Sequence, residues 1–141
     1  MVRLAKPGDL DLVYELCREA MGKAVYSHLP YNEYDARKMM ARLILSESVW
    51  VTEKVDGVLM ACIQPVWFNS ELKTSSDLVF YVRERCKSEG YRLAKEYIKW
   101  AKEHVDWVCL SISFGGDIER TEKFYEKLGF VRMGGTYLLR G

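Results

Sequence analysis

Two predominantly apolar runs on either side of an amphipathic segment constrain the fold of this chain more than any other feature. Residues 78–82 and 107–112 are apolar along most of their length, which is typical of strands covered on both faces. Between them, apolar residues recur at intervals of three and four, as on one side of a helix. They are Leu93, Ala94, Tyr97, Ile98, Ala101 and Val105. The pattern predicts a strand, a helix and a second strand in a layered α/β domain.

Strand and helix signals alternate along the rest of the chain as well. Strand-like composition occurs at residues 2–4, 49–52 and 58–63, and helical spacing at 10–20, 35–45 and 118–128. The pair Asp56-Gly57 is typical of a tight turn in which glycine takes a positive φ. Gly129 is typical of the residue that ends a helix.

The last segment, residues 130–139, has two short apolar stretches around a Gly-Gly pair and predicts a terminal hairpin. The full order is then β-α-α-β-β-β-α-β-α-β-β. This order predicts an α/β fold with a central mixed sheet of six to seven strands flanked by about four helices. A length of 141 residues fits a single domain over residues 1–141.

Charge and cysteine usage narrow the function classes. Lys plus Arg is 21 and Asp plus Glu is 20, giving a formal charge of +1, which argues against a dedicated nucleic-acid binder without excluding a local patch. We expect no membrane association, because no stretch approaches the ~20 apolar residues of a span. The four cysteines form no C-x-x-C pair and have no metal-ligand spacing with the two histidines. We therefore expect no metal and a reduced, cytoplasmic protein.

Three segments resemble the GNAT superfamily of N-acetyltransferases, and the order of elements agrees with that family along essentially the whole chain. They are the strand at residues 77–82, the loop and helix at 85–100, and the run Tyr125-Glu126-Lys127-Leu128-Gly129-Phe130, which matches the family's Tyr-x-x-x-Gly-Phe signature. The aromatic segment at 65–69 and the strand at 77–82 are also similar to the small GNAT proteins of bacteriophages. The resemblance implies a GNAT-like fold and acyl transfer from acetyl-CoA to an amine.

The family's acyl-CoA loop has two registers in this chain. Residues 87–92 keep the middle glycine but end in Arg92, whereas residues 85–90 keep the first Arg and the last Gly but have Ser in the middle. The second register places Leu93 and Ala94 at the apolar positions that follow, so we prefer it. The first N–H groups of a helix bind phosphate well. The implied acetyl-CoA site comprises Phe80, Tyr81 and Val82, whose backbone would pair with the pantetheine arm, and Arg85, Lys87, Ser88, Glu89 and Gly90.

Acyl transfer to an amine needs a proton acceptor for the ammonium and a proton donor for the leaving thiolate. By resemblance, Tyr125 is the general acid, and Asp77, at the start of the strand, is the general base. Glu71 and Glu84 are reserve bases. Because direct attack needs no covalent intermediate, Cys62 and Cys109 are expected to be inert thiols in apolar strands.

By resemblance, the connection between the first two helices forms one wall of the acceptor site, and the aromatic segment could add to it. His28, Tyr31 and Trp67 are the predicted acceptor-binding residues, with Tyr26 and Phe68 beside them; Trp67 and Phe68 equally suit a homodimer surface. The acceptor is a small-molecule or protein amine. Two alternatives stay open: a non-catalytic GNAT-like partner-binding module, favoured by the irregular loop, and a phage-type enzyme that modifies nucleobases.

Overall fold

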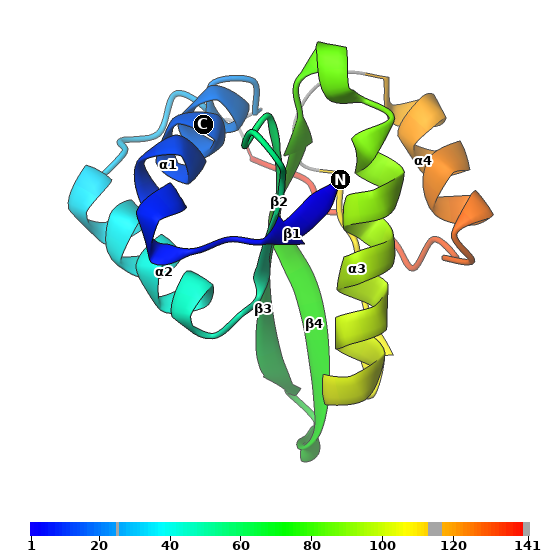
Figure 1. The fold of residues 1–141 in the computed structure, drawn as a ribbon. Helices are drawn as coiled ribbons and strands as arrows, with labels where there is room; N and C mark the ends of the chain where they lie inside the picture. Colours follow the sequence, from blue (N-terminus) through cyan, green and yellow to red (C-terminus); the bar gives the residue numbers. More distant parts are fainter. Residues whose placement is uncertain (25, 113–116, 140–141) are drawn as a thin grey trace.

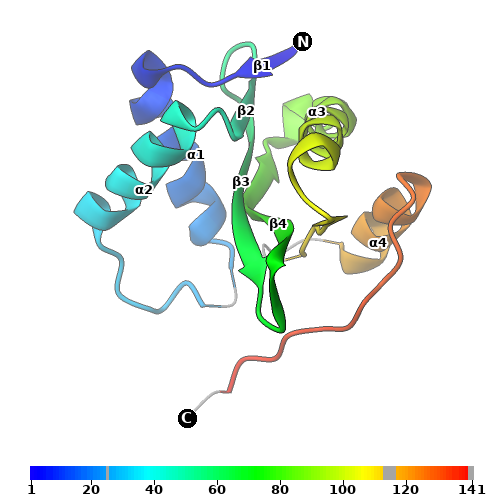
Figure 2. The same cartoon turned by 90° about the horizontal axis from the view of Figure 1, so that it is seen from below.

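The computed structural model describes residues 1–24, 26–112 and 117–139. Within these ranges, five strands form one sheet: β1 (Val2–Leu4), β2 (Val49–Thr52), β3 (Gly57–Val66), β4 (Asn69–Val82) and β5 (Trp107–Val108). The helices are α1 (Leu10–Met21), α2 (Glu33–Leu45), α3 (Glu89–His104) and α4 (Ile118–Lys127), with 3-10 turns η1 (Pro7–Asp9) and η2 (Glu84–Cys86). Helices α1 and α2 cover one face of the sheet and α3 covers the other, with α4 beyond it (Figures 1 and 2). Among the helices described, none combines the length and the apolar character needed to cross a bilayer.

The strands follow one another across the sheet in chain order, from β1 to β5. Neighbours are antiparallel up to β4, and β4 and β5 are parallel, joined by the crossover helix α3. Parallel neighbours need such a long connection, usually a helix. The structure thus confirms the predicted mixed α/β fold and its central strand–helix–strand unit.

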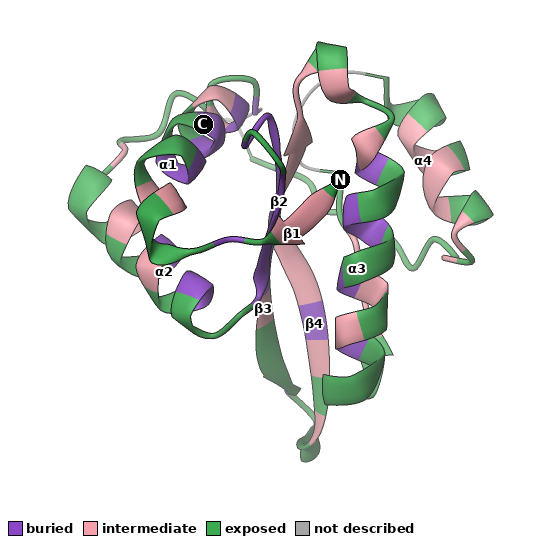
Figure 3. Cartoon of the chain, in the orientation of Figure 1, coloured by how far each residue is buried: buried purple, intermediate pink, exposed green. Residues whose placement is uncertain are grey.

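The sheet is buried on both faces because successive residues of its central strands point to opposite sides. In β2, Val49 and Val51 pack into a core with α1 and α2, whereas Trp50 packs into a second core with α3. In β3, Val58 belongs to the first core and Leu59 to the second. Figure 3 shows this burial concentrated in β2, β3 and the inner faces of the helices. The two cores hold β3 and the adjoining half of β4 in fixed positions.

The structure has fewer strands than the six to seven expected, and the difference lies at the C-terminal end. Only Trp107 and Val108 of the predicted strand 107–112 join the ladder, opposite Thr74 and Ser75. Residues 130–139, the expected terminal hairpin, contain no strand, and Val131 is 89% exposed. An isolated hairpin is marginal in water unless a further strand or helix covers it, and the two paired residues of β5 offer little edge for that.

The turn between β2 and β3 also departs from expectation. The positive φ belongs to Val55, at 58°, and not to Gly57. Gly57 is needed for space instead, because an added Cβ would lie 3.1 Å from the side chain of Thr52 and 3.2 Å from that of Val82. Glycine at this position lets the turn pack closely against the end of β4.

Candidate active site

The site begins where β4 and β5 separate. The Cys109 N–H donates to the Ser75 carbonyl at 2.8 Å, continuing the parallel pairing. Two residues further on, the Ser111 N–H donates instead to the Asp77 carboxylate, at 2.7 Å. The Asp77 side chain thus takes the place of a backbone carbonyl, and the two strands part beyond it. We call this place the fork.

A β-bulge in β4 lies at the fork. Met60 pairs with Val79, and the next residue of β3, Ala61, pairs with Asp77, so Leu78 is an extra residue on β4. A bulge bends its strand and redirects the side chains beside it. Leu78 thereby separates the sheet-like half of β4 from the half that borders the groove described below.

Asp77 supplies the carboxyl group at the fork. Burial raises the pKa of its carboxyl to about 6, and the hydrogen bonds from Ser111 and Ser76 hold the rise back. A carboxyl that titrates near 6 can accept a proton close to neutral pH and still give it up. This pKa suits the general-base role predicted for Asp77, and the role itself stays a prediction.

Tyr125 reaches the same residue, Ser111, from α4. Its hydroxyl donates to the Ser111 carbonyl at 2.7 Å. Burial, and then the nearby charge of Asp77, raise the pKa of this hydroxyl above its ordinary value of 10. Asp77 and Tyr125 are therefore both hydrogen-bonded to the backbone of Ser111, the first as an acceptor and the second as a neutral donor.

The end of α4 explains why the sequence places Tyr125 there. The Phe130 N–H donates to the Tyr125 carbonyl and the Gly129 N–H to the Glu126 carbonyl, both at 3.0 Å. Gly129 has φ of 99°. These are the bonds of a Schellman motif, in which an apolar contact joins the flanking residues. Here the rings of Tyr125 and Phe130 are 6.0 Å apart, so the Tyr-x-x-x-Gly-Phe run fixes the direction of the tyrosine.

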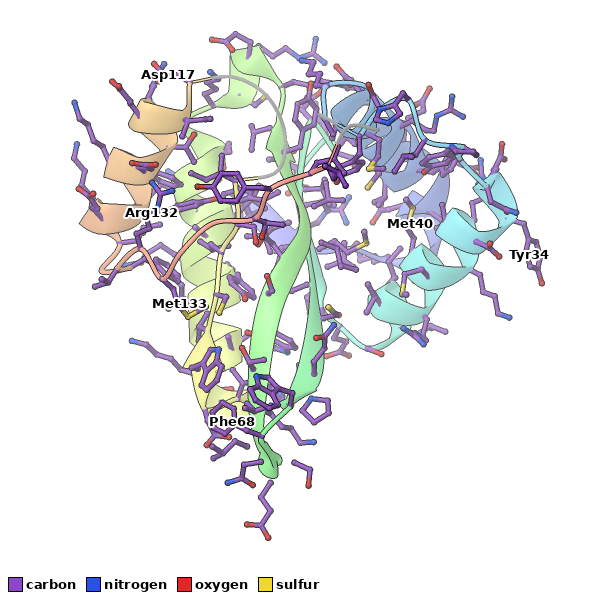
Figure 4. All side chains as sticks on the ribbon, turned by 180° about the vertical axis from the view of Figure 1, so that it is seen from behind. Tyr34, Met40, Phe68, Asp117, Arg132 and Met133 are labelled. Carbon is purple, nitrogen blue, oxygen red and sulfur yellow. The ribbon has the colours of Figure 1, made fainter. Side chains whose placement is uncertain are left out.

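A groove of about 590 Å³ opens beside the fork. One wall is the end of β4, with Phe80, Tyr81 and Val82, and the other is α4, with Phe124 and Tyr125. The remaining lining residues are Lys23, Glu84, Lys87, Gly90, Ser111, Ile112, Asp117, Arg120 and Thr121. Figure 4 shows Asp117 at the start of α4. The groove has the volume of a small-molecule site, with both polar and apolar walls.

The predicted loop residues divide between the groove and the surface. Lys87, just before α3, and Gly90, in its first turn, line the groove. Arg85 does not, because its guanidinium lies 2.6 Å from Asp56. Ser88 and Glu89 are also outside the lining, and Glu89 pairs with the ammonium of Met1 at 3.3 Å. Among the described residues, the cations that line the groove are therefore Lys23, Lys87 and Arg120, and the sequence predicts only Lys87 of these three.

The three predicted acceptor residues lie away from the groove. His28 is exposed in the connection between α1 and α2. Tyr31 packs edge-on against Tyr14, with ring centroids 6.1 Å apart. Trp67 is 93% exposed at the tip of the β3–β4 hairpin, where Figure 4 shows its neighbour Phe68. Their part in acceptor binding stays a prediction.

The reserve bases and the thiols have other surroundings. Glu71 is exposed, and Glu84 borders the groove and pairs with Lys87 at 3.0 Å. All four cysteines are unpaired. Cys17 is buried in the first core, and burial raises the pKa of its thiol to about 12. Cys62, Cys86 and Cys109 are half-buried.

Several residues at the site carry no strong sequence signal. Ser111 is a polar interruption in an apolar run, which could have marked a change of pairing. Tyr97 lies at an apolar position of the α3 spacing, so the sequence does not indicate a role for its hydroxyl. Lys23, Arg120 and Thr121 come to the groove only through the packing of α1 and α4, which local patterns do not reveal.

No protein-family model and no curated protein matches the sequence. Solved structures do match. A probable acetyltransferase has a TM-score of 0.72 at 17% identity, over 99% of this chain and 97% of its own. A Trypanosoma brucei acetyltransferase has a TM-score of 0.67 at 18% identity, over 99% and 98%. A chain of the NatC complex, solved with Gag peptide and CoA, has a TM-score of 0.69 at 16% identity, over 95% and 86%. The chain therefore has the fold of GNAT acetyltransferases.

Proposed function

We propose that this protein transfers an acetyl group from acetyl-CoA to an amine. The single observation that carries the proposal is the convergence of Asp77 and Tyr125 on Ser111, at the fork and beside the groove. Amine acylation requires a proton acceptor and a proton donor near the reacting atoms. The shared contact with Ser111 brings one of each close together. The fold, shared with acetyltransferases, supports the assignment.

The groove residues suit a long ligand with phosphates at one end. Lys23, Lys87 and Arg120 supply positive charge. The first N–H groups of a helix such as α3 have no partner four residues earlier, although that of Gly90 donates to the Lys87 carbonyl at 3.1 Å. At Gly90 an added Cβ would meet only Val82, at an ordinary 3.8 Å. Packing therefore does not require glycine at this position. A side chain here would enter the groove, so glycine keeps the groove open. Phe80 and Val82 add apolar wall for the pantetheine arm.

The residues at the fork divide the proton transfers between them. Asp77, ionised above pH 6, accepts one proton from the ammonium, directly or through a water, and the neutral amine then attacks the thioester. As the C–N bond forms and the C–S bond breaks, Tyr125 donates its hydroxyl proton to the departing thiolate, and the second proton that leaves the nitrogen restores the Tyr125 hydroxyl. The raised pKa of Tyr125 keeps this hydroxyl protonated at neutral pH. The acceptor is then a small-molecule or protein amine that reaches Asp77.

Acetyl-CoA binding can be tested before any acceptor is known. At about 100 times Kd, the ligand should stabilise the protein by roughly 2.7 kcal/mol, read as a rise in melting temperature. Gly90→Val should fold normally and lose this rise, because the valine fills the groove. Gly8→Val is the matched control, since nothing lies within 4 Å of a Cβ at Gly8. No response of the wild type to millimolar acetyl-CoA would refute the proposal.

A non-catalytic partner-binding module is the second candidate. It is favoured by the loop before α3, where Arg85 is held by Asp56 and Glu89 occupies the first helical turn. Native mass spectrometry separates the two candidates. Co-purified CoA, or release of free thiol from acetyl-CoA with a panel of amines, favours the enzyme. The absence of both co-purified CoA and a thermal response to acetyl-CoA favours the module.

A further inference from the structure

Tyr97 places a hydroxyl at the closed end of the fork. The side chain projects from α3 and is fully buried. Its hydroxyl donates to the Cys109 carbonyl at 2.7 Å and lies 3.0 Å from the Ser75 hydroxyl. Because a phenol has one proton and a carbonyl can only accept, the Ser75 hydroxyl must be the donor to Tyr97. One side chain thereby bridges β4 and β5 at their last paired residues.

Packing alone does not account for this hydroxyl. The ring of Tyr97 contacts Trp50 and Trp100, with centroids 6.0 and 6.3 Å apart, and a phenylalanine ring would fill the same space. A buried hydroxyl costs free energy unless it is hydrogen-bonded. Tyr97 avoids that cost only because Ser75 and Cys109 are placed to bond with it.

The bridge lies two residues from the proposed chemistry on each strand. Along β4, Ser75 is followed by Ser76 and then Asp77. Along the other arm, Cys109 is followed by Leu110 and then Ser111, whose N–H and carbonyl contact Asp77 and Tyr125. Any change in the separation of Ser75 and Cys109 is carried along both arms to the hydrogen bond between Ser111 and Asp77.

We propose that Tyr97 is a positioning residue, which fixes the fork so that the Ser111 peptide holds Asp77 and Tyr125 in place for proton transfer. The catalytic role of Tyr97 rests on the proposed function. Its effect on the hydrogen bond between Ser111 and Asp77 can be measured without any turnover. Tyr97 acts through Cys109 and Ser75 and does not line the groove.

Four titratable groups face Asp77 from the elements packed around it. They are Tyr26 from the connection between α1 and α2, Cys62 from β3, Tyr97 from α3 and Tyr125 from α4. The pKa of each is raised, first by burial and also by the charge of Asp77. All four therefore stay neutral while Asp77 titrates. The hydrogen bond from Ser111 lowers the pKa of Asp77, so weakening that bond should raise it.

The test is Tyr97→Phe, with Tyr91→Phe as the matched control, because Tyr91 lies on the same helix and is 51% exposed. NMR of the Asp77 carboxyl carbon gives its titration, and the Ser111 amide gives its proton shift. In Tyr97→Phe we expect the Asp77 pKa to rise by roughly half a unit to one unit, as loss of a hydrogen bond to the charged form implies, and the Ser111 amide shift to move. We expect kcat to fall about tenfold, with KM for acetyl-CoA within twofold of wild type, the pattern of an interaction made in the transition state.

An unchanged Asp77 titration and Ser111 shift in folded Tyr97→Phe would overturn the proposal. If that variant does not fold, Ser75→Ala decides, because it removes the β4 side of the bridge alone. A smaller shift in the same direction supports positioning, and no shift overturns it. A wild type that binds no acetyl-CoA would refute the proposed function, while the NMR comparison would still test the fork.

Discussion

The two walls of the groove are built in different ways. The β4 wall joins a sheet with buried side chains on both faces, whereas none of residues 118–127 of α4 is buried. Figure 3 shows the contrast between the two regions. The cap at Asp117 and the Schellman bonds fix the two ends of α4 itself. Its contacts with the rest of the molecule include the hydrogen bond from the Tyr125 hydroxyl to Ser111 and the ring of Phe124, whose centroid is 6.4 Å from that of Phe80. The proposed chemistry thus lies between a densely packed scaffold and a wall whose helix buries none of its residues.

If the α4 wall contributes more to chemistry than to stability, Tyr125→Phe should lower turnover strongly and the free energy of unfolding only slightly. The variant keeps the ring and its contact with Phe130 and loses one hydrogen bond, which costs roughly 1 kcal/mol. Turnover should fall about 10²–10⁴-fold with unchanged acetyl-CoA affinity, the range for a positioned proton donor. Steady-state kinetics and a melting curve measure both effects. Turnover within threefold of wild type would leave water as the proton source.

The scaffold should show the opposite behaviour. Leu16 of α1 is fully buried, and Leu128, just after α4, is half-buried. Leu16→Ala should lower the free energy of unfolding by about 2–5 kcal/mol, the usual cost of a core cavity. Leu128→Ala should cost about 1 kcal/mol, since less apolar surface is lost. Equal losses in urea titrations of the two variants would contradict the contrast between the walls.

Asp77 lies at the border of the two regions and should show its burial as a pH effect. Its pKa in the folded protein is about 6, against an ordinary value of 3.8. The protonated form is therefore favoured by folding, and its stabilising contribution is complete below pH 4 and is lost as pH rises through 6. Asp77→Asn removes this loss.

We therefore expect Asp77→Asn to gain stability relative to wild type between pH 4.5 and pH 8, by about 1–3 kcal/mol. Urea unfolding at both pH values measures the difference. Asp35→Asn, at an exposed position of α2, is the matched control. A difference between Asp77→Asn and wild type that does not grow with pH would mean that the carboxyl is well solvated.

The smallest expected effects come from the two helix caps. Asn32 accepts from the Asp35 N–H at 3.0 Å in α2, and Asp117 accepts from the Arg120 N–H at 3.1 Å in α4. Removing either cap costs roughly 0.5–2 kcal/mol. Because α2 contributes Met40, Leu43 and Ile44 to the core, Asn32→Ala should lower the global melting temperature.

Asp117→Ala should instead leave the melting temperature nearly unchanged and speed amide hydrogen exchange in α4, because α4 can open locally. Exchange measured by mass spectrometry, with and without acetyl-CoA, would show this. Faster exchange in both helices, or a lower melting temperature in both variants, would mean that α4 unfolds together with the scaffold.

Local patterns predicted the parts of this molecule whose structure is locally determined. The spacing of Leu93, Ala94, Tyr97 and Ala101 gave the buried face of α3, and Gly129 gave the end of α4. The fork could not be predicted in this way, because it depends on the register of β4 against β3 and on the bulge at Leu78. The expected hairpin at 130–139 failed for a related reason: apolar alternation does not reveal whether a neighbouring strand offers an edge.

The four cysteines differ in burial, so their rates of reaction with a thiol reagent would report which part of the structure opens. A thiol reacts with a labelling reagent as the thiolate and only when it is accessible. Cys17, buried in the first core with a pKa of about 12, should therefore react only when α1 leaves the sheet. Cys109, whose sulfur lies 3.7 Å from the Thr74 hydroxyl, sits on one arm of the fork. The labelling rate of Cys109 would report local opening of the fork, and that of Cys17 in the same sample would report opening of the core. The two rates can be compared without adding a cysteine to the sequence.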